Sequence, residues 1–558
     1  ALDVANFSGV KIPALMHTNG NVERTEDGSA KRNERGEVVY QRAPIWLDSE
    51  YLLGPEAGHA NWTGQSGLAT KTSHALFLTS AVFQTLKAEG KSVAALMFNV
   101  KGADLLWLDK PAIPESAMQE AYAAAAFRQL GEEDREVYQA LGLEPQPFTN
   151  FRIFAPFKPN LAPQTEGNSS KVFLEGKHHG TALNTQRTAP SETAGVVFPI
   201  LWELKPLLSM PHKVFDHNDL DDKMWGVIFE FRDRKVRSLI ELERIYEEID
   251  AHFAADPSEQ VWRGHHRLTL QKVRNRLKGL PGKLGGLLTN GEVDYGHLPR
   301  AEQPFGDQEL RVVDIASCNT NVQEVLVSSI IERIWRLAEE EQLGVDTVLI
   351  FVDELNKYAP GGGEGGLRDT LVDIAARGRH LNVVLFGAQQ FRSKVDDEIL
   401  GNCGTSLYGR VGDEELVNAA YRSLSETARA ELLGLPKGRL LVRHAHFRAP
   451  LFGAFPLPPT IPGVGGQKVF NQTNLKTVGH PADGLYRTIQ RVMGNSAPSR
   501  HEVLTFCEGH DPRVLDELCP KLTQEWERKK GTSAETRITI WMMAQNHLRQ
   551  SNIRLIKR

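Results

Sequence analysis

Apolar stretches of strand length alternate with longer amphipathic stretches in two separate parts of the chain. In the first part, a helix-like stretch at 73–90 is followed by a run at 93–100 that is apolar except for Asn99. A continuous apolar run is typical of a strand that is buried on both faces, so the alternation predicts an α/β fold with a parallel sheet covered by helices on both sides. In the second part the predicted strands are 309–317, 347–354, 382–390, 405–411 and 438–447, and the predicted helices are 322–340 and 368–380.

The rhythm breaks between these two parts, which predicts one core split by an insertion. The intervening stretch mixes an Ala-rich helix, further helices and segments of mixed character, and a Pro- and Gly-rich segment near Phe455 is typical of a linker. The predicted organisation is a β-rich segment at 1–54, an α/β core at 55–110 and 306–465, an inserted, mainly helical domain at 111–305, and a helical region at 466–558.

The composition is that of a folded protein without a strong net charge. The 65 basic and 70 acidic residues give a formal net charge of −5, which excludes a globally cationic nucleic-acid binder but not a local basic surface. The four cysteines include no CxxC pair, so we expect neither a disulfide framework nor a structural zinc site, and the chain fits a reducing cytoplasm. The apolar runs are shorter than the ~18 residues of a membrane span, so no membrane association is predicted.

A Gly-rich turn between a predicted strand and a predicted helix is a candidate phosphate site. Phosphates are bound by backbone N–H groups in a concave turn, the positive end of a helix and a Lys ammonium, and a hydroxyl can hold Mg²⁺. The turn departs from the P-loop pattern GxxxxGKT, because Thr70 replaces the glycine before the Lys. By itself the match is weak, because a Gly-rich turn with a Lys is more often an ordinary loop. The candidate residues are Gly64, Gln65, Ser66, Gly67, Leu68, Ala69, Thr70, Lys71, Thr72 and Ser73.

Two carboxylates, Asp353 and Glu354, follow the apolar run 348–352. Buried charge at the end of a strand is costly unless it is used. In P-loop ATPases the first acid of such a pair holds Mg²⁺ and the second activates the attacking water. Solvated acids at a strand end are the simpler alternative. Because this pair and the Lys71 turn occur in the right order on an alternating pattern, nucleotide hydrolysis is the favoured interpretation.

Further polar residues follow the acidic strand. Arg377 and Arg379 end the next predicted helix, where a guanidinium could reach the γ-phosphate of a neighbouring subunit. Any helix C-terminus also favours cations, so the arginines alone do not distinguish a catalytic role from a structural one. Gln389 and Gln390 close the following strand, where an amide could position water or only cap the sheet.

Three segments together resemble the HerA/FtsK superfamily of hexameric DNA-translocating ATPases, and HerA most closely. They read VLIFVDELNKYAP, DIAARGRHLNVVLFGAQQFRSKVDDEILGNCGTSLYGRV and LPKGRLLVRHAHFRAPLFGAFPLPP. The order and spacing of four motifs carry the resemblance, which covers about 55–110 and 309–457. It implies a RecA-like P-loop ATPase core that uses ATP and Mg²⁺.

The resemblance also implies roles for individual residues. Lys71 and Thr72 match the phosphate and Mg²⁺ residues, and Gln389 matches the polar sensor. Asp353 and Glu354 match the acidic pair.

Three further positions match the family less simply. Arg379 falls on an arginine that acts on the neighbouring subunit in relatives, whereas Arg377 falls just outside that alignment. Asn99 stands where relatives carry an acidic strand end, and Asp104 is a possible substitute.

The same resemblance implies an assembly and partners. Relatives form a ring of six subunits around duplex DNA and work with a nuclease or, in anti-phage systems, a nuclease or an NAD-hydrolysing effector. The segment 1–54 resembles the small barrel that docks such partners, and the region after 466 favours a defence-type relative. A ring scaffold with weak ATPase activity and a conjugation- or secretion-type ATPase are the alternatives.

The stretch 260–291 carries no acidic residue and seven basic ones, which makes it a candidate DNA contact. On one helix, four of its cations would form a ridge beside a stripe of leucines and a valine. A solvated face that balances the acidic stretch 242–250 is the plainer alternative, and Lys101 and the 391–396 loop (Phe391, Arg392, Lys394) are rival pore elements. The ridge residues are Arg263, Arg267, Arg274 and Lys278.

Overall fold

The computed structural model describes most of the first of two compact units, Ala1–Asn471 and Gln472–Arg558. The described residues are 6–32, 36, 38–65, 70–157, 183–202, 204–209, 215, 220–280, 284, 287–288, 299–362 and 366–471. Four candidate phosphate-site residues (Ser66, Gly67, Leu68 and Ala69) and nearly all of the predicted C-terminal helical region therefore lie outside the described residues.

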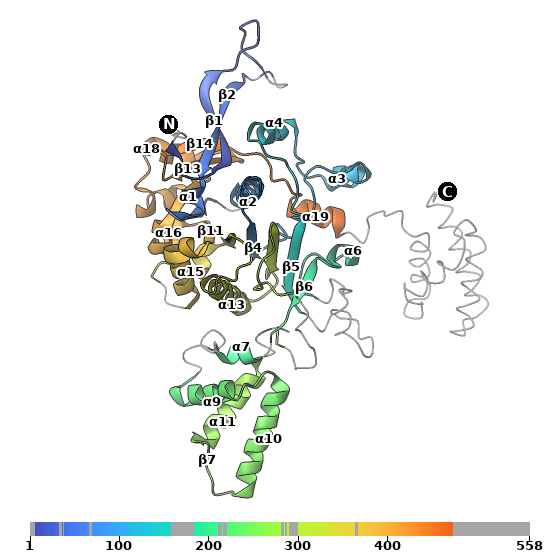
Figure 1. The fold of residues 1–558 in the computed structure, drawn as a ribbon, viewed down its shortest axis with the longest axis vertical. Coiled ribbons are helices and arrows are strands. Elements are labelled where there is room, and N and C mark those ends of the chain that lie inside the picture. Colours follow the sequence, from blue (N-terminus) through green and yellow to red (C-terminus); the bar gives the residue numbers. More distant parts are fainter. Residues whose placement is uncertain are drawn as a thin grey trace, which may run out of the picture. The chain divides into compact units, whose positions relative to one another are not determined.

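The described residues form a 12-stranded sheet in the order β2-β1-β14-β13-β12-β3-β11-β10-β4-β9-β5-β6 (Figure 1). From β12 to β6 every neighbouring pair is parallel, and the pairs from β12 to β2 are antiparallel. The strands are β1 Lys11–Val22, β2 Tyr40–Asp48, β3 Gly58–Thr63, β4 Val93–Asn99, β5 Asn150–Pro156, β6 Val197–Ile200, β9 Glu309–Asp314, β10 Thr347–Asp353, β11 Val383–Gln389, β12 Cys403–Tyr408, β13 Arg439–His444 and β14 Leu451–Ala454.

Strand β10 shows why the parallel strands read as continuous apolar runs. Val348, Ile350 and Val352 point into one hydrophobic cluster, and Leu349 and Phe351 point into the other. All five side chains are buried, because helices cover both faces of the sheet. The predicted strands at 93–100, 309–317, 347–354 and 382–390 are thus confirmed as central strands.

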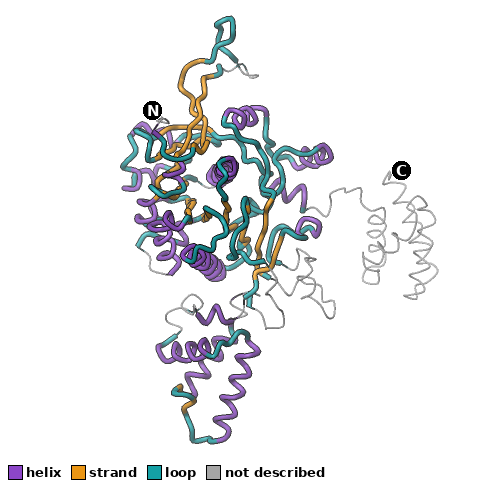
Figure 2. Tube along the Cα trace, in the orientation of Figure 1, coloured by secondary structure: helices purple, strands orange, loops and turns teal. Residues whose placement is uncertain are grey.

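Helices α2, α13 and α15 are the main helices of the core. Helix α2 belongs to one hydrophobic cluster, and α13 and α15 belong to the other. The Asn319 side chain caps α13 by accepting a hydrogen bond from the N–H of Val322. The remaining purple segments in Figure 2 are mostly short. The helices of the core and its edges are α1 Ser49–Leu52, α2 Thr70–Ala88, α13 Thr320–Glu339, α14 Leu355–Tyr358, α15 Gly366–Arg377, η6 Gly378–Leu381, η7 Arg392–Lys394, α16 Asp397–Asn402, α17 Asp413–Leu416, η8 Ala419–Tyr421, α18 Glu426–Leu433 and α19 Gly463–Phe470.

The first strands of the chain extend the main sheet. Strand β1 pairs with β14, and β2 pairs with β1 over most of its length. The Asp48 carboxylate fixes the start of the described chain by accepting hydrogen bonds from the N–H groups of Ser8 (2.9 Å) and Gly9 (3.0 Å). Part of the predicted segment 1–54 is therefore an antiparallel edge of the sheet, joined to the core by backbone hydrogen bonds.

The region predicted as an insertion contributes to the same sheet. Strands β5 and β6 lie within 111–305, yet they pair in parallel with β9 and with each other. Sequence reasoning did not identify them as core strands, because β6 is only four residues long and contains Pro199. The helices of this region are η2 Ser116–Met118, α3 Gln119–Ala125, α4 Glu132–Ala140, α6 Pro190–Thr193, α7 Leu204–Ser209, α9 Asp222–Asp233, α10 Leu239–Ala255 and α11 Arg267–Lys278.

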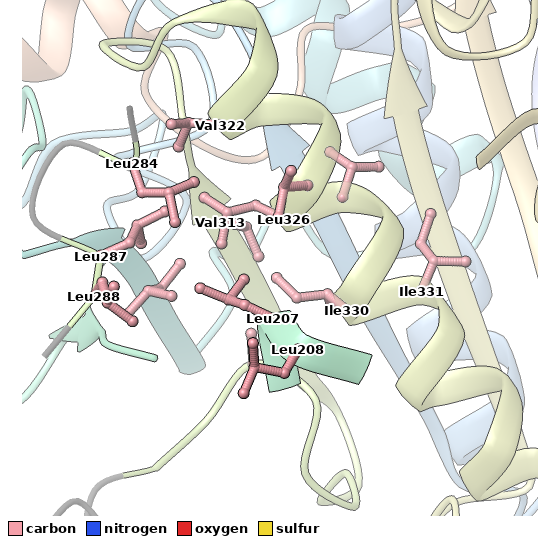
Figure 3. Packing of buried hydrophobic residues seen from close by; sticks show 14 of the residues in the cluster. Leu207, Leu208, Leu284, Leu287, Leu288, Val313, Val322, Leu326, Ile330 and Ile331 are labelled. Carbon is pink, nitrogen blue, oxygen red and sulfur yellow. The ribbon is translucent and has the colours of Figure 1, made fainter. Parts of the chain in front are cut away.

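Leucines of the inserted region pack against α13. Figure 3 shows Leu207, Leu287 and Leu288 beside Leu326 and Ile330 in one cluster of buried side chains. At about 25 cal/mol per Å² of buried apolar surface, such a seam holds the helical part of the insertion to the core.

Helix α11 is shorter than the sequence predicts. A two-stranded sheet of β7 (Val261–Trp262) and β8 (His265–His266) precedes it, so the helix begins at Arg267. The predicted apolar stripe of α11 is buried as expected, at Leu270, Val273 and Leu277.

The strand order of the core defines its class. Numbered by their order along the chain, β12, β3, β11, β10 and β4 are core strands 5-1-4-3-2. One strand thus separates the strand before the Gly-rich turn from the strand that ends in acids. This is the arrangement of a RecA-like P-loop fold, so the predicted fold class is confirmed. Among the described helices, none is both long and apolar enough to cross a membrane.

Candidate active site

Polar residues gather where the parallel strands end. In this kind of sheet, ligands bind outside the carboxyl ends of the strands. The register places Gln389 of β11 opposite Thr63 of β3, and Asp353 of β10 opposite Ala388 of β11. Asn99 of β4 and Asp314 of β9 are likewise opposite each other. The order of the strands therefore brings residues that are up to 326 positions apart to a single edge.

Lys71 lies in the first turn of α2, immediately after the Gly-rich turn. It is only 6% exposed, and its ammonium donates a hydrogen bond to the carbonyl oxygen of Gly64 at 2.9 Å. Burial lowers the pKa of Lys71, whereas the charges of Asp353 and Glu354 act in the opposite direction. Among the described residues no carboxylate forms an ion pair with Lys71, and a buried cation of this kind at the start of a helix is suited to bind an anion.

The described part of the turn is fixed at its start. The N–H of Gly64 donates to the carbonyl of Gln389 at 3.3 Å, and the N–H of Gln65 donates to the carbonyl of Arg410 at 2.8 Å. At its other end, Thr70 is buried as the first residue of α2, and Thr72 and Ser73 are half-buried in the same turn. Thr72 thus directly follows Lys71 in the first turn of α2, as the P-loop pattern requires.

The two acids are held in a specific backbone conformation. Glu354 adopts left-handed dihedral angles (φ 56°, ψ 44°), which are unfavourable for a residue with a Cβ atom. Its N–H donates to Oδ1 of Asp353 at 2.9 Å. Strained residues of this kind are found at functional sites, where the surrounding structure holds them. The side chains of Asp353 and Glu354 remain 10% and 24% exposed, so both can be reached from solvent.

Lys101 is a member of the site that sequence reasoning placed elsewhere. Its ammonium lies 3.6 Å from Oδ2 of Asp353 and also forms a closer ion pair with Glu354. The sequence offered one signal. Lys101 follows β4, and the strand after the first core helix is expected beside β10, the strand that ends in Asp353. A role as a pore residue stays a prediction.

Asn61 was missed by the sequence reasoning. Its side chain and that of Gln389 form a reciprocal amide pair, with N···O distances of 2.9 and 2.7 Å, and both residues are fully buried. Gln389 also donates to the hydroxyl of Thr63 at 2.6 Å, and Arg392 donates to Oδ1 of Asn61 at 2.8 Å. The available signal was a polar residue at every second position of β3, at His59, Asn61 and Thr63.

The strand end at Asn99 is occupied by an amide. Asn99 donates to the carboxylate of Asp314 at 2.8 Å, so the nearest buried acid comes from β9. Asp104 lies in the loop after β4, where burial and, secondly, the charge of Asp353 raise its pKa. Substitution of Asp104 for the acid of relatives therefore stays a prediction.

Arg377 and Arg379 do not reach this edge within one chain. Arg379 lies in η6, where it donates to the carbonyl of Glu56 at 3.2 Å and packs against Gly54 and Gly58. Gly58 begins β3, so this arginine is at the opposite end of the strand that leads to Lys71. Arg377 pairs with Asp373 at 3.2 Å. A role of Gln390 at the site stays a prediction.

The predicted basic ridge is balanced by acids. Arg274 forms ion pairs with Glu243 (2.8 Å) and Asp250 (3.0 Å), and Lys278 lies 3.4 Å from Glu243. These acids come from α10 and belong to the acidic stretch 242–250. Two further ridge residues differ in their surroundings.

Arg263 lies in the β7–β8 turn rather than on the helix, and it pairs with Glu230 at 3.2 Å. Arg267 is exposed and stacks over the ring of Phe253. The ion pairs therefore support the plainer interpretation of the ridge, a helix face balanced by its acidic neighbours, and a DNA contact here stays a prediction.

The donor set fits a Mg²⁺–nucleotide. Mg²⁺ prefers hydroxyl and carboxylate oxygens together with phosphate, and Thr72 and Asp353 could supply them. Lys71 and the N-terminus of α2 could hold phosphates. No group of three or more His, Cys, Asp or Glu side chains suited to a metal occurs among the described residues, so the fit depends on the phosphates as additional ligands.

Comparisons with known proteins give only weak structural likenesses. No protein-family model matches the chain, and no curated protein matches it. VirB4 of Thermoanaerobacter pseudethanolicus is 12% identical, with a TM-score of 0.39 over 78% of this chain and 98% of that one. Two other similar structures have equally low identity.

The plasmid coupling protein TrwB in complex with ADP and Mg²⁺ is 12% identical, with a TM-score of 0.39 over 84% of this chain and 99% of that one. The genome packaging NTPase B204 of Sulfolobus turreted icosahedral virus 2 is 12% identical, with a TM-score of 0.22 over 27% of this chain and 68% of that one. The fold class therefore rests on the strand order of this chain itself.

Proposed function

We propose that the chain is a Mg²⁺-dependent ATPase. The observation that carries the proposal is the sheet edge at which Lys71, the Asp353–Glu354 pair and Gln389 come together in the strand order of a RecA-like fold. Each residue type has a part in phosphoryl transfer, which depends on positioning and on stabilising negative charge.

The proposed mechanism assigns one step to each residue. Lys71 would bind the phosphates, and Thr72 and Asp353 would hold Mg²⁺, which would neutralise phosphate charge. Glu354 orients a water molecule and accepts its proton. Gln389 holds that water in line with the phosphorus, and for this its amide must exchange a bond to Asn61 or Thr63.

Glu354→Gln tests the proposal. The amide keeps the shape of the side chain but cannot accept the proton, so kcat should fall by about 10² to 10⁴ while nucleotide binding stays within about threefold. Lys71→Ala is the matched control, and it should abolish binding itself. Full hydrolysis by Glu354→Gln would refute the assignment.

The resemblance to HerA/FtsK motors leads us to propose a hexameric ring in which Arg379 acts on the neighbouring subunit. Support comes from its distance from the site of its own chain, at the opposite end of β3. The test mixes Lys71→Ala and Arg379→Ala subunits, each inactive alone. If the arginine acts between subunits, an equal mixture should regain activity at roughly a quarter of its sites. A mixture without activity would place both residues in one chain's site.

The motor function proposed on this basis is translocation along duplex DNA that powers a nuclease or an NAD-hydrolysing effector, as in anti-phage defence or DNA end processing. The segment 1–54 is proposed as the docking region. ATP hydrolysis should then rise when DNA and the partner are added together.

A specific observation keeps the ring scaffold with weak ATPase activity as a second candidate. Thr70 replaces a P-loop glycine, and Lys101 pairs with both acids of the site. Under the scaffold hypothesis, hydrolysis stays slow with DNA and partner, and the Glu354→Gln variant still assembles and activates the effector.

A further inference from the structure

The loop after β4 is fixed on both sides of Lys101. The carbonyl oxygen of Gly102 accepts hydrogen bonds from Asn99 (3.0 Å) and from Gln186 (2.9 Å). Ala103 is buried, and the backbone at Ala103 lies directly against Gly463 of α19. Lys101 is therefore held at a set position above the sheet edge.

This position places the Lys101 ammonium over both acids. It pairs with Glu354 and lies 3.6 Å from Asp353. Lys71 also interacts electrostatically with these two acids, but its ammonium points to Gly64 instead. Among the described residues, Lys101 is thus the one cation that forms ion pairs with these carboxylates.

We propose that Lys101 is the resident counter-ion of the Asp353–Glu354 pair, and that a divalent metal ion must displace it when the site is loaded. The inference rests on the proposed Mg²⁺–ATP function and adds a residue to it. An ammonium cannot coordinate phosphate and carboxylate together as a divalent cation does, but it occupies the same region of negative potential.

The strength of the pair suits displacement. The Lys101 side chain is 48% exposed, so solvent weakens its attraction to the acids. A divalent ion carries twice the charge and gains further ligands from phosphate. While the ammonium holds Glu354, that carboxylate is withheld from water. Loading of metal and nucleotide then releases Lys101 from the acids and frees Glu354 as a base.

Metal binding without nucleotide tests the inference directly. The probe is Mn²⁺ alone, titrated into the full nucleotide-free chain and followed by the spin resonance of the free ion. Lys101→Met should bind Mn²⁺ about fivefold more tightly, which corresponds to about 1 kcal/mol. Lys101→Arg keeps the cation and should stay within about twofold of the unaltered chain.

Lys91→Met is the matched control. It also removes one exposed lysine, but at the opposite end of β4, so it measures the effect of net charge alone. If Lys101→Met does not fold, Lys101→Gln replaces it. Equal Mn²⁺ affinity for Lys101→Met and Lys91→Met would overturn the inference.

A second measurement separates this inference from the proposed function. Binding of a fluorescent ADP analogue is measured with Mg²⁺ and with a chelator. In Lys101→Met, the factor by which Mg²⁺ tightens binding should grow about fivefold. Tighter Mn²⁺ binding without nucleotide binding in any variant would refute the ATPase and keep the counter-ion. If nucleotide binds but Lys101→Met leaves the metal affinity unaltered, the ATPase proposal stands and the counter-ion inference is refuted.

Discussion

The side-chain amides of Asn61 and Gln389 hydrogen-bond to each other in both directions, at 2.9 and 2.7 Å. The pair joins β3, which leads to the Gly-rich turn, to β11, which ends at the predicted sensor. Replacing Asn61 by Leu leaves Gln389 with unmet hydrogen bonds in a buried place. We expect Asn61→Leu to lower the free energy of unfolding by about 1 to 3 kcal/mol, measured by urea denaturation.

An exposed amide pair supplies the control. Asn19 donates to Gln41 at 3.3 Å and also joins two neighbouring strands, β1 and β2. Because water can replace that bond, Asn19→Leu should change stability by less than about 0.5 kcal/mol. An equal loss of unfolding free energy in the two variants would show that the buried pair stabilises the fold no more than the exposed pair.

The buried ring of His74 should make the protein sensitive to acid. Nδ1 accepts from the indole of Trp62 at 3.0 Å, and Nε2 donates to the carbonyl of Ala14 at 3.1 Å. Burial lowers the pKa of His74 from 6.5 to about 3, although the bond to Ala14 opposes this shift. The unfolded chain therefore takes up its proton first as pH falls below 6.5.

This linkage predicts a loss of stability from His74 between pH 6.5 and 3, at about 1.4 kcal/mol per pH unit. Burial also lowers the pKa of His59 and His444 to about 4, which acts in the same direction. Urea denaturation of His74→Gln at pH 7.5 and 5 should show a shallower pH slope than the unaltered chain. His252→Gln makes the same replacement at an exposed position and serves as the control.

The left-handed backbone of Glu354 predicts a conflict between stability and activity. Glu354→Gly removes the strained Cβ atom, whereas Glu354→Gln keeps it, and both remove the charge. The Gly variant should therefore be about 1 kcal/mol more stable than the Gln variant, as measured by thermal unfolding. Both should lack hydrolysis. A less stable Gly variant would mean that the surrounding structure carries no strain at this residue.

Paired cations should contribute little to DNA binding. Four free cations on the ridge would give a salt-dependence slope of about 3.6, because each phosphate contact contributes about 0.9. Ion pairs hold three of the four, so the joint change of the ridge residues to Ala should reduce the slope by less than about 2. The measurement is the affinity for duplex DNA at salt concentrations from about 50 to 300 mM. A loss near 3.6 would restore the ridge as the main contact. The changed residues are Arg263, Arg267, Arg274 and Lys278.

The central strands could be predicted from the sequence, because burial on both faces leaves a continuous apolar run. The acids at 353–354 and Lys71 could be predicted for the same reason, since each follows or precedes such an element. For Arg274 the sequence offered balance by the acidic stretch 242–250 as an alternative, but not the individual partners, which lie 24 and 31 positions away on a separate helix. The amide pair of Asn61 joins residues 328 positions apart, and no local pattern fixes such a contact.

Strand β3 begins at Gly58, against Arg379, and ends at Thr63, beside the Gly-rich turn. Its six residues span about 20 Å. In the proposed ring, each subunit would use one end of this strand to receive its own nucleotide and the other to support the arginine offered to its neighbour. Successive sites around the ring would then be linked through single stiff strands. Nucleotide binding at one site could shift the arginine at the next site without movement of whole domains.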